Sequence, residues 1–192
     1  MDADPKKRLR KRMRNVREAM SVTEWESSSG MAAANAAGLP EMLGAGSVML
    51  YLAMAERREV DTAPLVRMIG GGKERALYMP LCSGDSLCAV PFREGDPLFP
   101  GAFGQPEPVG GCVDVVPDVL VLPVVAVDAR GNRLGYGKGF YDRFISGLRR
   151  KGGEPFLLAL AFSFQIVDSL PKDPWDQAVD CIVTEKEVMR IR

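Results

Sequence analysis

Histidine is absent from this sequence of 192 residues. That absence excludes a Ser-His-Asp triad and any general base built on imidazole. Cysteine is scarce, and the four that occur show no C-x-x-C spacing, so no zinc site is indicated and we expect reduced thiols at Cys82, Cys88, Cys112 and Cys181. Chemistry without histidine must use carboxylates, amines, hydroxyls or electrostatic stabilisation. Phosphoryl transfer meets that condition, because the protein mainly positions groups and neutralises charge.

The sequence also lacks long hydrophobic runs and a net charge. Its apolar segments are too short, or too often interrupted by proline, to span a bilayer or direct secretion, so we expect a cytoplasmic protein that contacts no membrane. Its 25 lysines and arginines balance 25 aspartates and glutamates, which argues against a dedicated nucleic-acid-binding protein. The length fits one domain over residues 1–192, and we expect a monomer.

Cations nevertheless crowd the first segment, at Lys6, Lys7, Arg8, Arg10, Lys11, Arg12, Arg14 and Arg17. Among them Leu9, Met13, Val16 and Met20 recur at spacings of four, three and four, which predicts a helix docked on a core. An Asp-Pro pair at residues 4–5 marks its start. Three roles remain open for the cations: a solvated face, contacts to a phosphate group, and a nucleic-acid arm.

A glycine-rich loop follows the longest apolar run. Residues 119–127 predict a strand buried on both faces, because polar residues do not alternate with apolar ones. Residues 130–143 then combine four glycines with Arg133, Lys138 and Arg143. Backbone N–H groups of such a loop can approach phosphate oxygens closely, and the helix predicted to follow favours negative charge at its N-terminus. The loop predicts a nucleotide site, with a simple strand-to-helix turn as the alternative.

The two common phosphate-binding motifs do not fit this loop. A Walker motif requires serine or threonine after the lysine, and here Gly139 follows Lys138. A dinucleotide motif G-x-G-x-x-G requires a third glycine where Phe140 or Asp142 stands. A nucleotide loop of a different kind is therefore expected.

The segment from Arg133 to Arg143, RLGYGKGFYDR, resembles the signature R-L-G-x-G-x-G-[YF]-Y-D of the 5-formyltetrahydrofolate cyclo-ligase family. Other landmarks of that family occur in order along nearly the whole chain: Lys6-x-x-Leu9-Arg10, Glu59-Val60-Asp61-Thr62, Phe103 to Pro108, Pro117-Asp118, Gln165-Ile166-Val167, Asp176, Val179-Asp180 and Thr184-Glu185. Trp175 and the pair Arg57-Arg58 depart from residues that are usual in the family, and neither removes a chemical group assigned below.

The resemblance implies an enzyme that converts 5-formyltetrahydrofolate to 5,10-methenyltetrahydrofolate with ATP and Mg²⁺. The formyl oxygen would attack the terminal phosphoryl group, which turns a poor leaving group into a good one. The neighbouring secondary amine of the folate would then close the ring, and ADP and phosphate would be released. No enzyme nucleophile is needed, in agreement with the absence of histidine. The alternative is a catalytically inactive nucleotide-binding regulator on the same fold.

The resemblance also assigns residues to the nucleotide and the metal. The catalytic residues would be Arg10, Arg133 and Lys138. ATP would contact Lys6, Arg10, Arg133, Leu134, Gly135, Tyr136, Gly137, Lys138, Gly139, Phe140 and Tyr141. Asp142 and Asp176 would hold Mg²⁺, because carboxylates suit a hard cation that bridges phosphate oxygens. Without the resemblance, Asp142 could be a first-turn helix acid and Asp176 an ordinary surface acid.

The folate substrate would contact Arg10, Met54, Glu59, Phe103, Tyr136, Gly137, Lys138, Gly139 and Phe140. We assign Glu59 to the polar edge of the pterin ring, where a carboxylate can accept hydrogen bonds from a ring N–H and an exocyclic amine. A helix cap or a solvated acid is the alternative for Glu59. The aromatic residues would supply flat apolar walls, although any of them could instead belong to the core.

Strands alternate with helices along the chain, which predicts an α/β fold. Two helices are expected at the N-terminus, the second running from a capping pattern at Ser21 to Gly38. Further helices are predicted at 64–69, ended by glycines 70–72, and at 141–150, with strands at 48–52, 76–79, 87–92, 119–127, 156–161 and 181–184. This order predicts a three-layer α/β/α domain with a mostly parallel central sheet and ligands at the carboxyl ends of its strands. Residues 81–117 are rich in proline and glycine and are expected to form a functional loop region.

Overall fold

A central sheet of seven strands organises the computed structural model, which describes residues 4–70 and 75–191. In spatial order its strands are β12 (Val188–Arg190), β11 (Cys181–Val183), β9 (Phe156–Leu160), β6 (Val119–Pro123), β1 (Ser47–Leu50), β2 (Ala76–Ser83) and β3 (Ser86–Phe92). The pairings from β11 through β2 are parallel, whereas β12 and β3 lie antiparallel at the two edges. The predicted α/β class with a mostly parallel sheet is confirmed.

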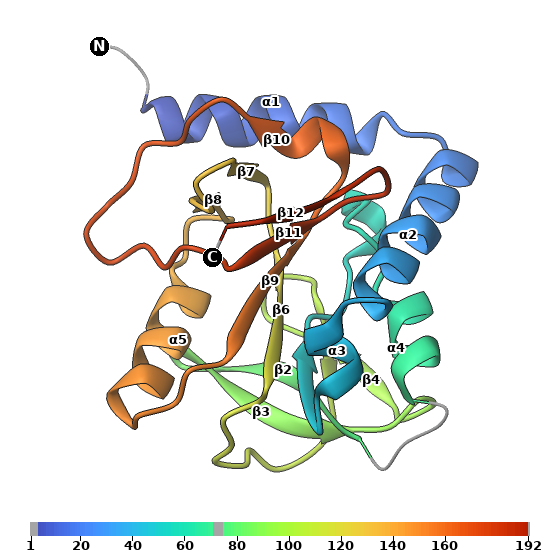
Figure 1. Ribbon diagram of the computed structural model, residues 1–192, viewed down its shortest axis with the longest axis vertical. Coiled ribbons are helices and arrows are strands. Elements are labelled where there is room, and N and C mark those ends of the chain that lie inside the picture. Colours follow the sequence, from blue (N-terminus) through green and yellow to red (C-terminus); the bar gives the residue numbers. More distant parts are fainter. Residues whose placement is uncertain (1–3, 71–74, 192) are drawn as a thin grey trace.

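Helices lie against both faces of this sheet (Figure 1). α2 (Val22–Ala37), α3 (Pro40–Gly44) and α4 (Ala63–Gly70) occupy one side, and α5 (Phe140–Arg150) occupies the other. α1 (Pro5–Glu18) runs across the end of the molecule at which β6 leads into β7. The helix expected at 64–69 is α4; of the glycines predicted to end it, residues 71–72 lie outside the described residues.

The core follows the alternation of side chains along the central strands. In β6, Val119 and Val121 pack with the helices α2 to α4, whereas Leu120 and Leu122 pack with Ile145 of α5. Strands β1, β9 and β11 divide their residues between the same two apolar clusters. Both faces of the parallel sheet are therefore buried, which explains why residues 119–123 carry no polar alternation.

Sequence signals account for the starts of the first two helices. The Asp4 side chain accepts a hydrogen bond from the Lys6 backbone N–H at the beginning of α1, next to Pro5. Ser21 and Glu24 cap α2 reciprocally, each side chain accepting from the backbone N–H of the other residue. Reciprocal caps of this kind satisfy backbone donors that the first helical turn leaves without partners.

The apolar stripe predicted for α1 is wrong at one position. Leu9 and Met13 pack against the chain near Leu134, as expected, but Val16 is 45% exposed. Arg17 is buried in its place, with 2% of its surface exposed. A spacing of four residues from Met13 to Arg17 keeps the same helix face, so the buried stripe continues through a charged residue.

The single strand predicted at 119–127 is also wrong, because the chain leaves the main sheet after Pro123. β7 (Ala126–Asp128) belongs to a second sheet, between β8 (Arg133–Leu134) and β10 (Ile166–Val167). The backbone carbonyls of the two residues between β6 and β7 accept hydrogen bonds from the Gln165 side chain. Gln165 Nε2 donates to Val124 O (2.8 Å) and to Val125 O (3.1 Å). The glycine-rich loop thus begins from a hairpin, β7–β8, rather than directly from the long strand.

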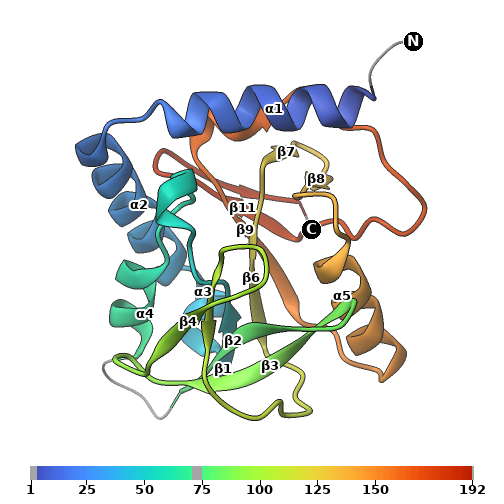
Figure 2. The same cartoon turned by 180° about the vertical axis from the view of Figure 1, so that it is seen from behind.

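Residues 81–117 contain more regular structure than one strand. β2 extends to Ser83 and forms a hairpin with β3, and a small sheet joins β4 (Leu98–Pro100) to β5 (Pro106–Pro108). Seen from behind, the β2–β3 hairpin reaches across to α5 (Figure 2). Sequence analysis also did not identify α3, β10, β12 or the 3-10 helices η1 (Ala55–Arg57) and η2 (Ser163–Gln165).

The expectation of four reduced cysteines is wrong for one pair. Cys88 of β3 and Cys112 form a disulfide, with their Cα atoms 5.6 Å apart. An isolated antiparallel bridge between Ala89 and Val113 brings the two cysteines together. Cys82 and Cys181 are free thiols. Within the described ranges, the helices are all too short or too polar to cross a bilayer.

Candidate functional site

A cavity of about 1330 Å³ opens where the parallel strands end. Its wall includes Tyr51 and Leu52 directly after β1, Cys82 near the end of β2 and Pro123 at the end of β6. Every residue that sequence analysis assigned to ATP, folate or metal lines this cavity. The fold therefore brings together residues that are up to 170 positions apart in the chain.

Glycines 135, 137 and 139 form one side of the cavity. At two of these positions the backbone has a conformation that favours glycine. Gly137 has φ +95° and Gly139 has φ +68°, a region that other residues rarely adopt. Arg10 Nε donates to Gly135 O (2.9 Å), and a Cβ atom on Gly137 would lie 3.2 Å from Arg10 Cζ. The loop backbone therefore lies directly against a guanidinium group from α1.

Arg143 joins this glycine loop to the β2–β3 hairpin. Its Nε donates to Asp85 O in the hairpin turn (2.6 Å), and its Nη2 donates to Lys138 O (2.9 Å). A Cβ atom on Gly139, which caps α5, would lie 2.9 Å from Arg143 Nη1. The positive φ favours glycine here, and any other residue would also have to displace the end of the Arg143 side chain.

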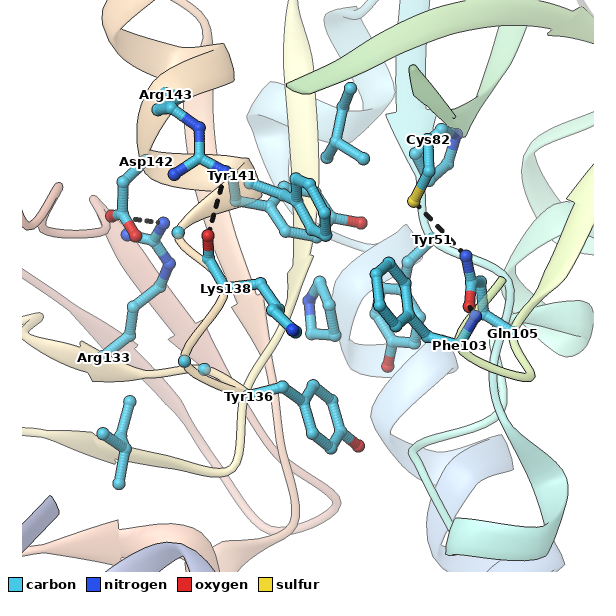
Figure 3. A pocket seen from close by; sticks show the side chains of 18 of the residues that line it. Tyr51, Cys82, Phe103, Gln105, Arg133, Tyr136, Lys138, Tyr141, Asp142 and Arg143 are labelled. Carbon is cyan, nitrogen blue, oxygen red and sulfur yellow. Dashed lines mark hydrogen bonds and ion pairs between the residues drawn. The ribbon is translucent and has the colours of Figure 1, made fainter. Parts of the chain in front are cut away.

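Lys138 extends into the cavity between two aromatic walls (Figure 3). Its ammonium group lies 5.1 Å from the centre of the Phe103 ring, which in turn lies 5.7 Å from the Phe140 ring. Tyr136 stands on the same side of the cavity as Lys138 and comes from the same loop. The exposed Lys138 side chain supplies positive charge next to an aromatic part of the cavity wall.

Arg133 and Asp142, assigned separately to phosphate and metal, form an ion pair with each other. Arg133 Nη2 lies 2.8 Å from Asp142 Oδ1, and Arg133 also donates to Gln177 O. The same Asp142 oxygen accepts from the Gln177 backbone N–H (3.1 Å). Burial lowers the pKa of Arg133, and the neighbouring Asp142 opposes that effect. This pair fixes the first turn of α5 to the loop that contains Gln177.

Lys6 forms a similar link from α1. Its Nζ lies 2.6 Å from Asp173 Oδ2 and 3.1 Å from Asp176 Oδ2, and the Asp173 backbone N–H donates to the same Asp176 oxygen (2.8 Å). Partial burial acts to lower the pKa of Lys6, but hydrogen bonds and charge attraction to the two aspartates raise it. Lys6 is therefore a firmly charged group that closes the 173–176 loop over one end of the cavity.

Glu59 is a buried carboxylate at the other end, with 3% of its surface exposed. Its Oε2 accepts from the Met54 backbone N–H (2.7 Å) and its Oε1 accepts from the Tyr136 hydroxyl. Burial raises the pKa of Glu59, while these hydrogen bonds and the charges of Arg17 and Arg57 counteract the rise. A carboxylate held in this way can accept further hydrogen bonds from a ligand in the cavity.

The wall opposite the glycine loop is held by Gln105. Gln105 Nε2 donates to Glu107 Oε1 (2.8 Å) and contacts Cys82 Sγ (3.3 Å), and its Oε1 accepts from the Phe103 backbone N–H (3.0 Å). These contacts fix the segment that presents Phe103 to the cavity (Figure 3). Burial, reinforced by Glu107, raises the pKa of Cys82 to about 11, so its thiol stays protonated at neutral pH.

Comparison with known proteins identifies the family. The sequence profile of the 5-formyltetrahydrofolate cyclo-ligase family matches residues 2–185. The chain belongs to this family. The 5-formyltetrahydrofolate cyclo-ligase of Escherichia coli K12 is 29% identical over 183 residues, which cover 92% of this chain and 98% of that protein.

Solved structures agree with the family assignment. The NMR structure of Aquifex aeolicus 5,10-methenyltetrahydrofolate synthetase is similar with a TM-score of 0.82 at 36% identity, covering 97% of this chain and 93% of that one. A 5,10-methenyltetrahydrofolate synthetase from Mycoplasma pneumoniae has a TM-score of 0.75 at 22% identity and covers 95% and 99% of the two chains. This second likeness shows the shared fold alone.

The two aspartates that the family resemblance assigns to magnesium do not form a complete metal site. In the described part of the chain, no three acidic, histidine or cysteine side chains are grouped to hold a metal ion. Asp142 uses Oδ1 and Asp176 uses Oδ2 in the contacts above, and their second oxygens make none with the described residues. Magnesium is usually held by one or two carboxylates together with phosphate oxygens and water. The residues thus fit an ion that arrives with a nucleotide.

Several cavity residues of this cyclo-ligase family member were not identified from sequence. They include Arg14, Tyr51, Arg57, Cys82, Ser146, Arg150, Asp173 and Trp175. Ser146 and Arg150 lie four and eight residues after Asp142, so a helical spacing from the signature could have indicated them. Tyr51 and Cys82 depend on which strand ends meet in the folded sheet, and their immediate sequence carries no comparable signal.

Proposed function

We propose that this protein converts 5-formyltetrahydrofolate to 5,10-methenyltetrahydrofolate, using ATP and Mg²⁺ and releasing ADP and phosphate. One observation carries the proposal: in a member of the cyclo-ligase family, a single cavity joins a cationic glycine loop at a helix N-terminus to a buried carboxylate flanked by aromatic rings. The first part suits a triphosphate and the second part suits a pterin. A reaction between those two ligands requires both in one cavity.

The glycine loop would bind the phosphates of ATP. Backbone N–H groups of residues 135–139 and the N-terminus of α5 favour an anion, and Lys138 and Arg10 add full positive charge. Arg133 would act indirectly, because its guanidinium is committed to Asp142 and to Gln177 O. Lys6 would act in the same way, since it is held by Asp173 and Asp176.

The folate would occupy the half of the cavity that contains Glu59. The lone pairs that Met54 and Tyr136 leave on its carboxylate can accept hydrogen bonds from a pterin ring N–H and the exocyclic amine. Phe103 and Phe140 would pack on the flat ring faces, as aromatic residues do in ligand pockets.

Asp142 and Asp176 would hold the magnesium ion through the oxygens not used by Arg133 and Lys6. When bound, the ion would neutralise charge on the phosphates. The cations already paired with these aspartates fix their positions, which is the contribution that this chain makes to the metal.

The reaction would proceed in two displacements. The formyl oxygen forms a bond to the terminal phosphorus as the bond from that phosphorus to ADP breaks. The secondary amine nitrogen then bonds to the formyl carbon and loses its proton to solvent, and the phosphorylated oxygen leaves as phosphate. Lys138, whose ammonium group lies 5.1 Å from the centre of the Phe103 ring, would neutralise charge that develops on the phosphoryl oxygens.

The test is the absorbance of the methenyl product when protein is mixed with 5-formyltetrahydrofolate, ATP and Mg²⁺. We expect product only when all three are present. Lys138→Met should lower the turnover rate at least about tenfold, because charge-stabilising groups in phosphoryl transfer carry at least that factor. Lys7→Met, which removes an exposed lysine from α1, is the matched control and should leave the rate unchanged.

Asp142→Ala should also lower turnover at least about tenfold. An equal rate in this variant would refute its assignment to the metal. Binding of ATP without any product, under conditions in which all three ligands are bound, would instead identify a regulator that binds nucleotide but does not catalyse.

A further inference from the structure

Arg17 is a buried cation that none of the assignments above uses. It lies on α1 and is 2% exposed. Its Nε donates to Arg57 O (2.7 Å), its Nη2 donates to the Tyr136 hydroxyl (2.6 Å) and its Nη1 reaches Val124 O (3.5 Å). These partners come from the turn after β1, the glycine loop and the segment between β6 and β7. One side chain therefore joins three segments that surround the cavity.

The contact to Tyr136 determines the direction of a hydroxyl proton. A guanidinium group can only donate hydrogen bonds, so the Tyr136 oxygen must accept from Arg17 with a lone pair. The single hydroxyl proton is then available for Glu59, whose Oε1 accepts it. Arg17, Tyr136 and Glu59 thus form a chain in which charge of opposite sign stands at the two ends.

We propose that Arg17 is a positioning residue for the folate half of the site, where it fixes the Tyr136 hydroxyl and, through it, the Glu59 carboxylate that receives the pterin. The inference rests on the proposed function, in which Glu59 accepts hydrogen bonds from the folate. Arg17 itself does not touch the substrate. Its role is to set the geometry and charge of the groups that do.

The charges around Glu59 support this role. Tyr51 is buried and Tyr141 is partly buried. Removal from water raises the pKa of both phenols, and the Glu59 charge raises it further. Burial raises the pKa of Glu59 itself, and Arg17 and Arg57 are the cations that oppose this. Arg57 Cζ lies 5.4 Å from the centre of the Tyr136 ring, whereas Arg17 also donates a hydrogen bond to the Tyr136 hydroxyl. Without Arg17 the carboxyl would lose both a compensating charge and an oriented donor.

A protonated Glu59 would donate where the pterin also donates, so folate binding requires the ionised form. Arg17→Met should let the pKa of Glu59 rise further. The acidic limb of kcat/KM for 5-formyltetrahydrofolate, plotted against pH, should therefore move to higher pH in this variant. Near neutral pH, KM for the folate should rise at least about tenfold, the factor that loss of a hydrogen bond to a charged group produces. KM for ATP should change less than about twofold.

Tyr136→Phe and the double variant Arg17→Met/Tyr136→Phe make the test specific. If Arg17 acts through the hydroxyl, replacing Arg17 should raise KM for the folate by a much smaller factor in the Tyr136→Phe background than in the wild type. Arg17→Lys keeps the positive charge but loses the several N–H donors of the planar guanidinium group. It should therefore restore the position of the acidic limb more than it restores KM for the folate. Arg12→Met is the matched control, because Arg12 is exposed on the same helix, and it should match the wild type.

The outcomes separate this inference from the proposed function. Wild-type protein that forms no product would overturn both. Wild-type turnover together with an unmoved acidic limb and equal losses in the two KM values in Arg17→Met would overturn the role of Arg17 alone. Additive effects in the double variant would do the same, because they describe a residue that merely holds α1 in place. If Arg17→Met does not fold in urea titrations, Tyr136→Phe and Arg17→Lys carry the same comparison.

Discussion

At the scale of single residues, neighbouring cations on α1 have different environments. Lys6, Arg10 and Arg17 face the cavity or the protein interior, whereas Lys7 and Arg12 are exposed. The helical repeat explains the division, because positions 6, 10, 13 and 17 share one face of a helix. A basic segment that resembles a solvated arm in sequence thus supplies several cations to the site and its surroundings.

Gly137 and Gly135 provide a matched test of the glycine loop. Gly137→Ala should raise KM for ATP at least about tenfold, because φ +95° is strained for alanine and its Cβ would press on Arg10. A Cβ atom on Gly135 would meet no atom within 4 Å, and Gly135 does not have a positive φ. KM for ATP in Gly135→Ala should therefore stay within about threefold of the wild-type value. Steady-state kinetics of both variants measure the difference. Equal effects would mean that loop flexibility, rather than backbone geometry, matters.

At the scale of elements, a covalent bond fixes β3 to the segment that follows β5. The Cys88–Cys112 bond closes a loop with a sequence separation of 24. A cross-link of this length stabilises a protein by about 3 kcal/mol through the restricted unfolded chain. Because the turn held by Arg143 leads into β3, the bond also restrains the hairpin that contacts the glycine loop.

Thiol titration in denaturant checks this bond. Protein unfolded without reductant should show two reactive thiols, those of Cys82 and Cys181, and four after reduction. Reduction should lower the free energy of unfolding by about 3 kcal/mol. The double variant Cys88→Ser/Cys112→Ser is the control and should not respond to reductant. Four thiols before reduction would contradict the prediction.

At the scale of the whole molecule, the sheet is stabilised from both faces. Leu120 of β6 is fully buried against the α5 side, next to Leu157 in register on β9. Leu120→Ala should lower the free energy of unfolding by about 2–5 kcal/mol, the usual cost of a large cavity in a core. Met68→Ala, at a position of α4 that is 52% exposed, should change it by less than about 1 kcal/mol. Urea titrations measure both, and similar losses would contradict the assigned core.

Much of the fold could be predicted because strong local signals coincide with the final structure. Asp4, Ser21 and Gly38 mark helix ends in the chain itself. The continuous apolar run at 119–123 indicates a strand covered on both faces. Short elements such as β10 and β12 depend on pairing with distant partners, so their own few residues carry no signal.

The candidate site divides in the same way. The residues that the resemblance assigns to ATP, folate and metal all line one cavity. The signature and the landmarks did not indicate that Arg133 pairs with Asp142 or that Arg17 reaches Tyr136. Such contacts join residues that are 9 and 119 positions apart, and only the packed chain sets their distances.

By itself, the sequence determined the family, the α/β class and the chemical groups available for catalysis, because each depends on residue types and short spacings. Tertiary structure decided which cation pairs with which carboxylate and that Cys88 bonds to Cys112. It also decided where the chain leaves the main sheet after β6. The reason is physical. Burial and charge pairing depend on distances between segments, and those distances exist only after the sheet has assembled.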